Sequence, residues 1–342
     1  MIRRQPSPLG CGFFITTKCN FKCNFCNLWK LESDDEMSEL ETKRIINELG
    51  RMDLIYLAIG GGEPLLVPHL FDSLAHAKKS GILFTHLVSN GFLMDQNRAK
   101  ELKKALLSEI SFSLDGDEVF HDQNRGIKNS FKKVMEAVEN VKIHSPETSI
   151  VLNTILDPTS PENALNAVKI AEKLNVKIKV QPFNQQLLFD TEPDREKSRQ
   201  LFQAEEIKYL LSAIDEIQKS DYVCNSRAFL ENYKAFLLTP EKMIFSGSDC
   251  LYGFHHLEIF QNQLFPCLEG LQGKNGTKLS KVSIKKLIRS PEYRKKVESL
   301  KKCTECKNNY YICYYEPRLN FPLWNFIKSR IFRYASSNKK YC

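Results

Sequence analysis

The 342-residue sequence contains no apolar run that approaches the ~18 residues required by a membrane-spanning helix. Its opening residues, MIRRQPSPLGCGFF, include two arginines but lack the apolar core and small-residue cleavage site of a signal peptide. The chain also has no low-complexity segment and no internal repeat beyond a strand and helix unit. From these absences we expect a cytoplasmic globular protein rather than a membrane-spanning or secreted one.

The composition supports a large folded domain. Hydrophobic residues make up 42% of the chain, which suffices for a substantial core. The net charge of +8 is spread over many lysines, with concentrations at 285–294 and 328–340. A lysine-rich solvated surface explains this pattern better than an anionic partner does, so we expect no nucleic acid partner.

Strand-like and helix-like segments alternate regularly through the first half of the chain. Six apolar runs predict strands at 12–17, 54–60, 82–89, 109–115, 149–156 and 176–183. Amphipathic segments predict helices at 41–50, 69–80, 97–107, 131–144 and 161–174. Near-continuous hydrophobicity is typical of parallel strands buried on both faces. The predicted fold is therefore α/β, a partial (β/α)6 TIM-like barrel with its chemistry at the carboxyl ends of the strands.

The pattern changes after the sixth predicted strand, which divides the chain into four parts. We expect the barrel at 1–190, a helical linker at 191–240, and a small metal-stabilised domain at 241–315. The remaining residues, 316–342, form an aromatic, basic tail. A helix that docks on the body explains this tail better than a membrane-surface helix, although membrane contact stays open.

Three cysteines lie close together directly after the first predicted strand. Cys19, Cys23 and Cys26 have the spacing C-x3-C-x2-C. Clustered thiolates in a reducing compartment are more often ligands than disulfides, and an all-thiolate set suits zinc or iron-sulfur. Three ligands leave one metal position open, which indicates a catalytic site. The alternative is a zinc knuckle with a distant fourth ligand.

The second predicted strand ends in AIGGGEPLL, residues 58–66. Glycines let a ligand approach the backbone closely, and Glu63 supplies a carboxylate that could pair with an ammonium group. A turn explains the glycines and Pro64 but not the acid. Beside a three-cysteine loop on the neighbouring strand, the motif predicts a ligand site.

Together these motifs closely resemble the radical S-adenosylmethionine (radical SAM) enzymes. The family form is C-x3-C-x-aromatic-C, with Phe25 as the aromatic residue, followed by GGEP after the second strand. The resemblance covers roughly residues 9–185. It includes SNG at 89–91 and SLDG…HDQNRG at 113–126, motifs that recur in members that modify peptides or mature other proteins.

The resemblance implies a 4Fe-4S cluster on Cys19, Cys23 and Cys26, with the fourth iron position taken by the amino and carboxylate groups of SAM. One electron from the reduced cluster would cleave SAM and release a 5′-deoxyadenosyl radical, which takes a hydrogen atom from the substrate. The protein would bind and position the reactants. A reducing partner such as flavodoxin or ferredoxin is expected.

The same resemblance assigns residues to SAM. Gly61, Gly62 and Glu63 would hold the methionine ammonium group. Ser113 would touch the ribose or the carboxylate, and Asn90 the ribose edge.

Further residues are weaker candidates at the same mouth. Arg125 would pair with the SAM carboxylate, or is an exposed arginine at a helix start. Asp115 would support the substrate side as a weak catalytic candidate, or belongs to an ordinary turn. Asn153 and Gln181, on the fifth and sixth predicted strands, point toward the same mouth if the barrel prediction holds.

A second cysteine group follows near the C-terminus. It is similar to the twitch and SPASM extensions of radical SAM enzymes, which carry auxiliary 4Fe-4S clusters. A full SPASM domain has seven cysteines, whereas this region has five, or six with Cys342, so we expect one auxiliary cluster. A structural zinc ribbon is the alternative. The candidate ligands are Cys250, Cys267, Cys303, Cys306 and Cys313.

Residues 255–267 read as a β-hairpin that delivers Cys267. Glu269 follows two residues later as a candidate base, although a surface carboxylate explains it better. The two cysteines outside the groups, Cys11 and Cys224, are expected in the core and in a structural role.

The leading hypothesis is a radical SAM oxidoreductase or maturase that oxidises or cross-links a peptide or protein, with help from the auxiliary cluster. The barrel begins about ten residues from Met1, which leaves no room for an N-terminal leader-binding domain and slightly weakens the peptide hypothesis. The same chemistry on a small metabolite, such as a sugar or lipid precursor, is the second hypothesis. A non-catalytic zinc protein that binds an acidic partner is the third.

Overall fold

A computed structural model of the chain describes residues 6–31, 36–184, 202–239, 250–271, 274–279 and 282–313. The tail predicted at 316–342, with Cys342, lies outside these residues, and so does the whole segment 185–201. Among the described residues, no helix is both long and apolar enough to cross a membrane.

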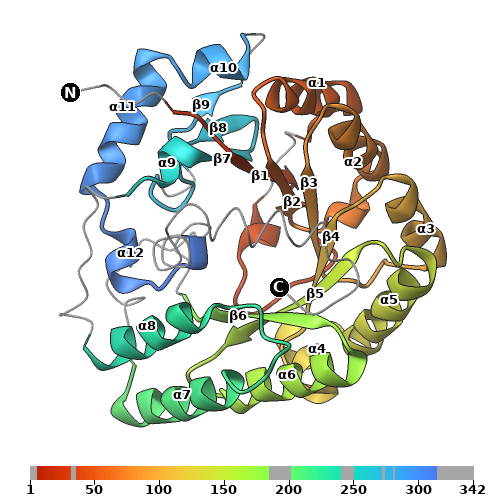
Figure 1. The fold of residues 1–342 in the computed structure, drawn as a ribbon, viewed down its shortest axis with the longest axis vertical. Helices are drawn as coiled ribbons and strands as arrows, with labels where there is room; N and C mark the ends of the chain where they lie inside the picture. The colour runs from red at the N-terminus through yellow and green to blue at the C-terminus, as the bar shows by residue number, and fades with distance from the viewer. Residues whose placement is uncertain are drawn as a thin grey trace.

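Six parallel strands form most of a curved nine-stranded sheet (Figure 1). They follow one another across the sheet in chain order, as in the predicted partial (β/α)6 barrel. Each strand lies within two residues of its predicted bounds at both ends. The strands are β1 (Gly10–Thr16), β2 (Tyr56–Gly61), β3 (Phe84–Ser89), β4 (Glu109–Ser113), β5 (Ser149–Leu156) and β6 (Lys177–Pro182).

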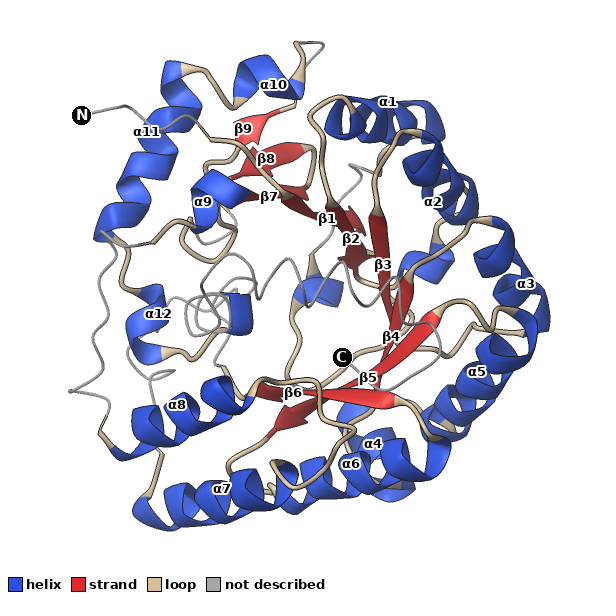
Figure 2. Ribbon diagram, viewed as in Figure 1, coloured by secondary structure: helices blue, strands red, loops and turns tan. Residues whose placement is uncertain are grey.

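The helices of the βα units cover the outer, convex side of the sheet (Figure 2). Five of them match the predicted helices, and α4 is additional. They are α1 (Glu39–Gly50), α2 (Leu70–Lys79), α3 (Gln96–Lys104), α4 (Glu118–Arg125), α5 (Ser130–His144) and α6 (Glu162–Leu174). Two 3-10 turns, η1 (Leu28–Lys30) and η2 (Pro64–Leu66), follow β1 and β2.

The core forms where the helices meet the sheet. Leu57 and Ile59 of β2 and Ile45 and Leu49 of α1 are all 0% exposed and belong to one core cluster. Burying a side chain of this size stabilises the fold by about 1.5–3 kcal/mol. Because alternate strand residues are turned outward into this core, the remaining residues of each strand face the barrel interior.

The helix α4 depends on its two ends rather than on an apolar face. Asp117 caps its start by accepting a hydrogen bond from the Phe120 backbone N–H at 3.0 Å. Gly126 ends it in the left-handed conformation, with φ of 70°. Its buried residues are His121 and Arg125. This short polar helix stands directly after the Ser113–Asp115 motif.

The C-terminal part of the chain continues the same sheet. Strand β7 (His256–Phe260) pairs in parallel with β1, and β8 (Gln263–Phe265) returns antiparallel, which confirms the predicted hairpin. Two helices, α7 (Ala204–Ile217) and α8 (Arg227–Leu238), connect β6 to this part, and α7 packs on α6. The remaining elements are α9 (Tyr252–His255), β9 (Thr277–Lys278), α10 (Ile284–Leu287), α11 (Pro291–Ser299), η5 (Leu300–Lys302) and α12 (Glu305–Asn308).

Candidate active site

The first cysteine group lies where the sequence predicts it, beyond the carboxyl end of β1. The loop that holds Cys19, Cys23 and Cys26 runs from β1 to η1, and the Cys23 side chain is buried. Burial is the main cause that raises the pKa of the Cys19 thiol to about 11; the Phe21 backbone N–H opposes this shift, and the charges of Glu63, Cys23 and Cys26 add to it. The three thiols and the Glu63 carboxylate are therefore electrostatic neighbours, and ionised thiols there would need a positive ligand.

The glycine loop after β2 lies directly against the cysteine loop. The Gly62 backbone N–H donates to the Thr16 carbonyl at 2.9 Å, and the Glu63 N–H donates to the Lys18 carbonyl at 2.8 Å. A side chain at Gly62 would place its Cβ 2.1 Å from the Lys18 carbonyl oxygen. Only glycine permits this approach, and the two loops therefore form one surface.

Glu63 is fully buried and accepts three hydrogen bonds. Its Oε1 accepts from the Leu65 N–H at 3.0 Å and from the Ser89 hydroxyl at 2.8 Å. Its Oε2 accepts from the Asn90 N–H at 2.8 Å. Burial raises the pKa of Glu63, and these three donors oppose that shift. A carboxylate offers about four acceptor positions, so one is left for an ammonium group.

Asn90 joins the third loop to the cysteine loop. Its side-chain Nδ2 donates to Oδ1 of the Asn20 side chain at 2.8 Å, and its Oδ1 accepts from the Phe92 N–H at 3.0 Å. Asn90 is 8% exposed, so this contact is shielded from water. The predicted contact of Asn90 with the SAM ribose stays a prediction. Sequence reasoning did not include Asn20 or Ser89, although Ser89 stands directly before Asn90 in the SNG motif.

Asp115 and Arg125 form a buried ion pair beside the cysteine loop. Arg125 Nε and Nη2 donate to the two oxygens of Asp115 at 2.6 and 2.8 Å, and Asn124 also donates to Asp115. The side chains are 1% exposed for Asp115 and 10% for Arg125. Arg125 is the last residue of α4, so the alternative of an exposed arginine at a helix start is wrong.

The predicted residues on β4, β5 and β6 share one face of the sheet. Ser113 and Asn153 are register partners on adjacent strands. Gln181 pairs with Ile155, which lies two residues after Asn153 and thus on the same face. Asn153 Oδ1 is buried and has no hydrogen-bond partner in the described part of the chain.

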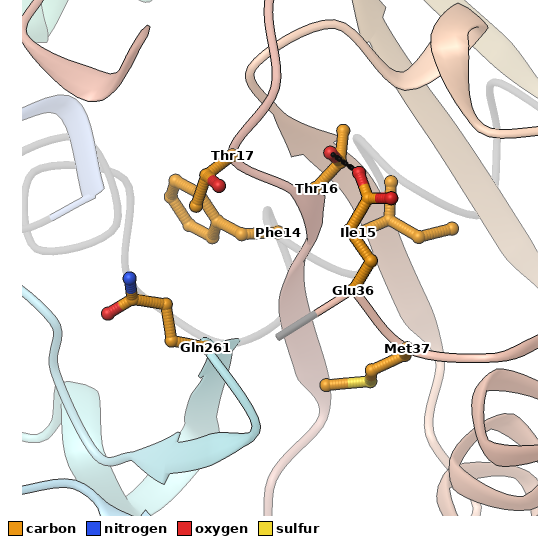
Figure 3. A pocket seen from close by; sticks show the side chains of 7 residues that line it. All are labelled: Phe14, Ile15, Thr16, Thr17, Glu36, Met37 and Gln261. Carbon is orange, nitrogen blue, oxygen red and sulfur yellow. Dashed lines mark hydrogen bonds between the residues drawn. The ribbon is translucent and has the colours of Figure 1, made fainter. Parts of the chain in front are cut away.

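A small cavity opens beside the end of β1, where Thr16 donates to Glu36 Oε1 at 2.9 Å (Figure 3). Lys18 reinforces that carboxylate with a hydrogen bond of 2.8 Å. Gln261, in the turn between β7 and β8, lies across the cavity from Thr16 (Figure 3). The cavity therefore lies between the end of β1 and the turn of the C-terminal hairpin. It is lined by Phe14, Ile15, Thr16, Thr17, Glu36, Met37 and Gln261.

The second cysteine group converges from distant parts of the C-terminal region. A Cβ placed on Gly270 would lie 3.4 Å from the sulfur atoms of both Cys267 and Cys303. Burial raises the pKa of the Cys306 thiol, and the charges of Cys313, Cys250 and Cys303 raise it further. All five predicted thiols are thus neighbours.

Two partly buried carboxylates accompany this second group. Burial raises the pKa of Glu258 to about 7, and Glu258 accepts a hydrogen bond from the Leu268 backbone N–H, next to Cys267. Burial and the charge of Glu258 raise the pKa of Glu269 to about 8, and the Tyr311 hydroxyl lies 3.4 Å from Glu269. Glu269 is partly buried, so its interpretation as a surface carboxylate is wrong. Sequence reasoning did not identify Glu258.

The chemistry of the donor sets fits iron-sulfur clusters. Each group is built from thiols alone, the ligands that iron-sulfur clusters use, and the first group offers three. Within the described ranges, no three metal-ligating side chains already stand in ligating geometry. Ligation would therefore draw the sulfur atoms together within loops that already hold them near one another.

Comparison with known proteins identifies the class. Residues 13–169 match the family model of the Radical SAM superfamily. This part of the chain is therefore similar to a radical SAM domain. The match begins in β1, includes the three cysteines and Glu63, and ends in α6.

Two curated relatives and one solved structure are also similar to this chain. The chain is 32% identical over 128 residues to Fe-coproporphyrin III synthase of Methanosarcina barkeri, covering 37% of this chain and 32% of that one. It is 30% identical over 135 residues to PqqA peptide cyclase of Bradyrhizobium diazoefficiens, covering 39% and 35%. The chain thus matches about a third of the length of these relatives. The fold is similar to that of Streptococcus suis SuiB bound to precursor peptide SuiA, with a TM-score of 0.64, 17% identity, and 88% and 70% of the two chains covered.

Proposed function

We propose that this chain is a radical SAM oxidoreductase or maturase. The observation that carries the proposal is the contact between the three-thiol loop and the Gly61–Glu63 loop, closed by the backbone hydrogen bonds to Thr16 and Lys18. A 4Fe-4S cluster with bound SAM supplies a 5′-deoxyadenosyl radical, which takes a hydrogen atom from the substrate. This family chemistry requires a cluster site directly beside a SAM site.

Different residues of the chain would bind the cluster and SAM. Cys19, Cys23 and Cys26 would hold the cluster, and Glu63 would accept from the methionine ammonium group of SAM with its remaining acceptor position. Because Glu63 is already fixed by three donors, its carboxylate is oriented before SAM binds. Ser113 would meet the ribose or carboxylate end from the next strand.

The C-terminal thiols would hold one auxiliary 4Fe-4S cluster. The convergence of Cys250, Cys267, Cys303, Cys306 and Cys313 supports this assignment. An auxiliary cluster would accept an electron from the substrate radical or ligate the substrate. We propose that residues 241–315 form the domain of this auxiliary cluster and that β7 joins this domain to the barrel.

A peptide or protein is the proposed substrate. PqqA peptide cyclase and the SuiB structure with its precursor peptide are both named for peptides, which supports this choice. A small metabolite is the second candidate, favoured by the likeness to Fe-coproporphyrin III synthase. A flavodoxin or ferredoxin would supply the electron. The many free cysteines among the described residues support a location in a reducing compartment, the cytoplasm.

The first test measures iron and SAM cleavage in the full chain. Anaerobically purified protein should be brown, hold about eight irons for two 4Fe-4S clusters, and form 5′-deoxyadenosine with SAM and reductant. The Cys23→Ala variant should lose this product, because one cluster ligand is missing.

The Cys250→Ala variant is the matched control for that test. It removes a thiol from the second group, so its iron should fall toward about four per chain while 5′-deoxyadenosine formation persists. Colourless protein that holds zinc alone would refute the enzyme proposal. Product from Cys23→Ala at the wild-type rate would refute the assignment of the first cluster.

A further inference from the structure

Two exposed lysines flank an indole ring on the cysteine loop. Lys22 lies between the first two cysteines of the loop, and Lys30 follows the third cysteine at the end of η1. The ammonium nitrogens of Lys22 and Lys30 each lie 5.5 Å from the centre of the Trp29 ring, within the range of a cation–π contact. These three residues form one exposed feature, which we call the lysine–tryptophan surface.

The charges of Lys22 and Lys30 have no acidic partner among the described residues. Neither side chain forms an ion pair with another part of the chain that the structure describes. Lys18, on the same loop, differs, because it pairs with Glu36 at 2.8 Å. Both unmatched charges lie beside one ring, so a single acidic partner can reach the two together.

Trp29 gives this surface an apolar centre that is held in place. Its ring is half-buried, with the Nε1 atom inside the protein. Its neighbour Leu28 is anchored in an apolar cluster with Phe260 and Leu268. A tryptophan with charged residues around it is typical of the centre of a protein–protein contact. The surface therefore fits a protein partner better than a small ion.

Helix α4 braces the loop from which Lys22 extends. The Asn24 backbone N–H donates to the Asn124 carbonyl at 3.2 Å. A Cβ at Gly126 would lie 3.2 Å from the Lys22 carbonyl oxygen, so the two backbones pack closely. This part of the surface is thus fixed before a partner arrives, which lowers the entropic cost of docking.

The same surface lies beside the thiols that would hold the cluster. Cys19 and Cys26 are partly exposed, so the cysteine loop reaches the outside of the protein near these lysines. Glu63, the proposed partner of the SAM ammonium group, is fully buried on the inner side of the loop. A protein that docks on the exposed side would therefore approach the cluster without crossing the SAM site.

We propose that Lys22, Trp29 and Lys30 form the docking surface for an acidic electron-carrier protein of the flavodoxin or ferredoxin kind. This inference rests on the proposed function, which requires an electron for SAM cleavage. The reduced carrier loses one electron and the cluster gains it, with no proton or group transferred. Charge complementarity supports this partner, because opposite potentials raise the rate of encounter by roughly 10- to 1,000-fold.

The first experiment measures the charge of the whole surface through binding alone. Oxidised flavodoxin is titrated into the reconstituted enzyme in a calorimeter, so that no electron is transferred. Binding should weaken as salt rises from about 0.01 M to about 0.15 M, because the Debye length falls from about 30 Å to about 8 Å. Glu32, Asp34 and Asp35 follow this surface in the sequence, outside the described residues. Binding that ignores salt, or strengthens with it, would overturn the inference.

The second experiment reverses the two charges with the double variant Lys22→Glu and Lys30→Glu. Its affinity for flavodoxin at low salt should fall by about tenfold or more, and so should the rate of 5′-deoxyadenosine formation with reduced flavodoxin. The rate with dithionite, a small reductant that needs no docking surface, should match the wild type.

Lys100→Glu with Lys173→Glu is the matched control. Both lysines are exposed, on α3 and α6 at the outer side of the barrel, and the change in net charge is the same. The control should keep the wild-type affinity for flavodoxin and the wild-type rate with either reductant. A control that loses as much affinity as the double variant would overturn the inference, because net charge alone would then explain the loss.

The remaining outcomes also decide. Wild-type affinity for flavodoxin in the charge-reversed enzyme would overturn the docking surface, and so would equal losses of rate with both reductants at full iron content. If charge reversal removes iron, Lys22→Gln with Lys30→Gln replaces it, and its affinity for flavodoxin should still fall. Loss of binding to phosphatidylglycerol vesicles at an unchanged flavodoxin rate would assign the surface to a membrane instead. A wild type that forms no 5′-deoxyadenosine with dithionite would refute the proposed function, whereas one that is active with dithionite but binds no flavodoxin would refute the docking surface alone.

Discussion

At the scale of single residues, the site depends on a buried polar group that several hydrogen bonds hold in place. Glu63 shows this most clearly, because a fully buried carboxylate without partners would be costly. Three donors from the ends of two loops meet its two oxygens, at 2.8 to 3.0 Å. The same residue therefore joins the loops after β2 and β3 and offers a negative charge to a ligand.

We expect Glu63→Gln to weaken SAM binding by about tenfold or more, since hydrogen bonds to a charged group contribute about 1.5–3 kcal/mol. The amide cannot satisfy the site in either orientation. With its nitrogen at the Oε2 position it faces the Asn90 N–H, and with its nitrogen at the Oε1 position it faces the Leu65 N–H. Isothermal titration of SAM into the reconstituted enzyme measures the change.

Glu109→Gln is the matched control for this prediction. Glu109 is a second buried carboxylate, at the start of β4, and its Oε1 lies 3.8 Å from His86 Nε2. This variant should retain wild-type SAM affinity because Glu109 lies at the opposite end of the strand from the site. Equal losses of affinity in both variants would show that Glu63 acts through general stability and not through the ammonium group.

At the scale of elements, the close approach of the β1 and β2 loops creates the site. Gly61 has φ of 124°, a conformation that favours glycine, and a Cβ there would lie 2.3 Å from the Thr16 carbonyl oxygen. Gly62 is as crowded by the Lys18 carbonyl. The glycines after β2 therefore allow the backbones of two loops of the chain to touch. They also leave room for a ligand.

Gly62→Ala should force the two loops apart and break the hydrogen bonds from Gly62 and Glu63. Two backbone hydrogen bonds at about 0.5–1.5 kcal/mol each predict a loss of roughly 1–3 kcal/mol in unfolding free energy. Urea unfolding and iron content measure the effect. Gly60→Ala is the control, because its Cβ would meet only Val88, at 3.9 Å. A Gly60→Ala variant as unstable as Gly62→Ala would contradict this explanation.

The strands could be predicted from the sequence because they are buried on both faces and read as continuous apolar runs. The helix α4 could not, because its buried residues are His121 and Arg125 and it has no apolar stripe. Two residues in the sequence mark the ends of this helix. Asp117, three residues before Phe120, is the N-terminal cap, and Gly126 follows the last turn. The ion pair that α4 carries was therefore missed, although both of its members were named separately.

At the scale of the whole molecule, β7 makes the barrel and the C-terminal region one sheet. The sequence predicts the hairpin but not its partner, because pairing between Gly10 and His256 links residues far apart in the chain. The signal was the pair of small residues on β1: a Cβ at Gly10 would lie 2.8 Å from His256, and one at Gly12 would lie 3.5 Å from Glu258. These glycines make room for the side chains of β7.

Glu258 stands at this junction, between β1 and the backbone of Leu268, and it should make stability depend on pH. Burial raises its pKa to about 7, above the value of ~4.5 in an unfolded chain. The unfolded state therefore releases this proton first as pH rises. The contribution of Glu258 to stability is complete below about pH 4.5 and is lost as pH rises through about 7, by up to about 3 kcal/mol.

The measurement is urea unfolding of the cluster-free chain between pH 5 and 8, wild type against Glu258→Gln. The amide stays neutral, so the variant should gain stability relative to the wild type across this range and then run parallel to it above about pH 7. Glu136→Gln, on the exposed face of α5, should keep the wild-type slope. A constant difference between wild type and Glu258→Gln at every pH would show that Glu258 does not change its charge there. The junction would then hold the two parts together through packing and the β1–β7 ladder alone.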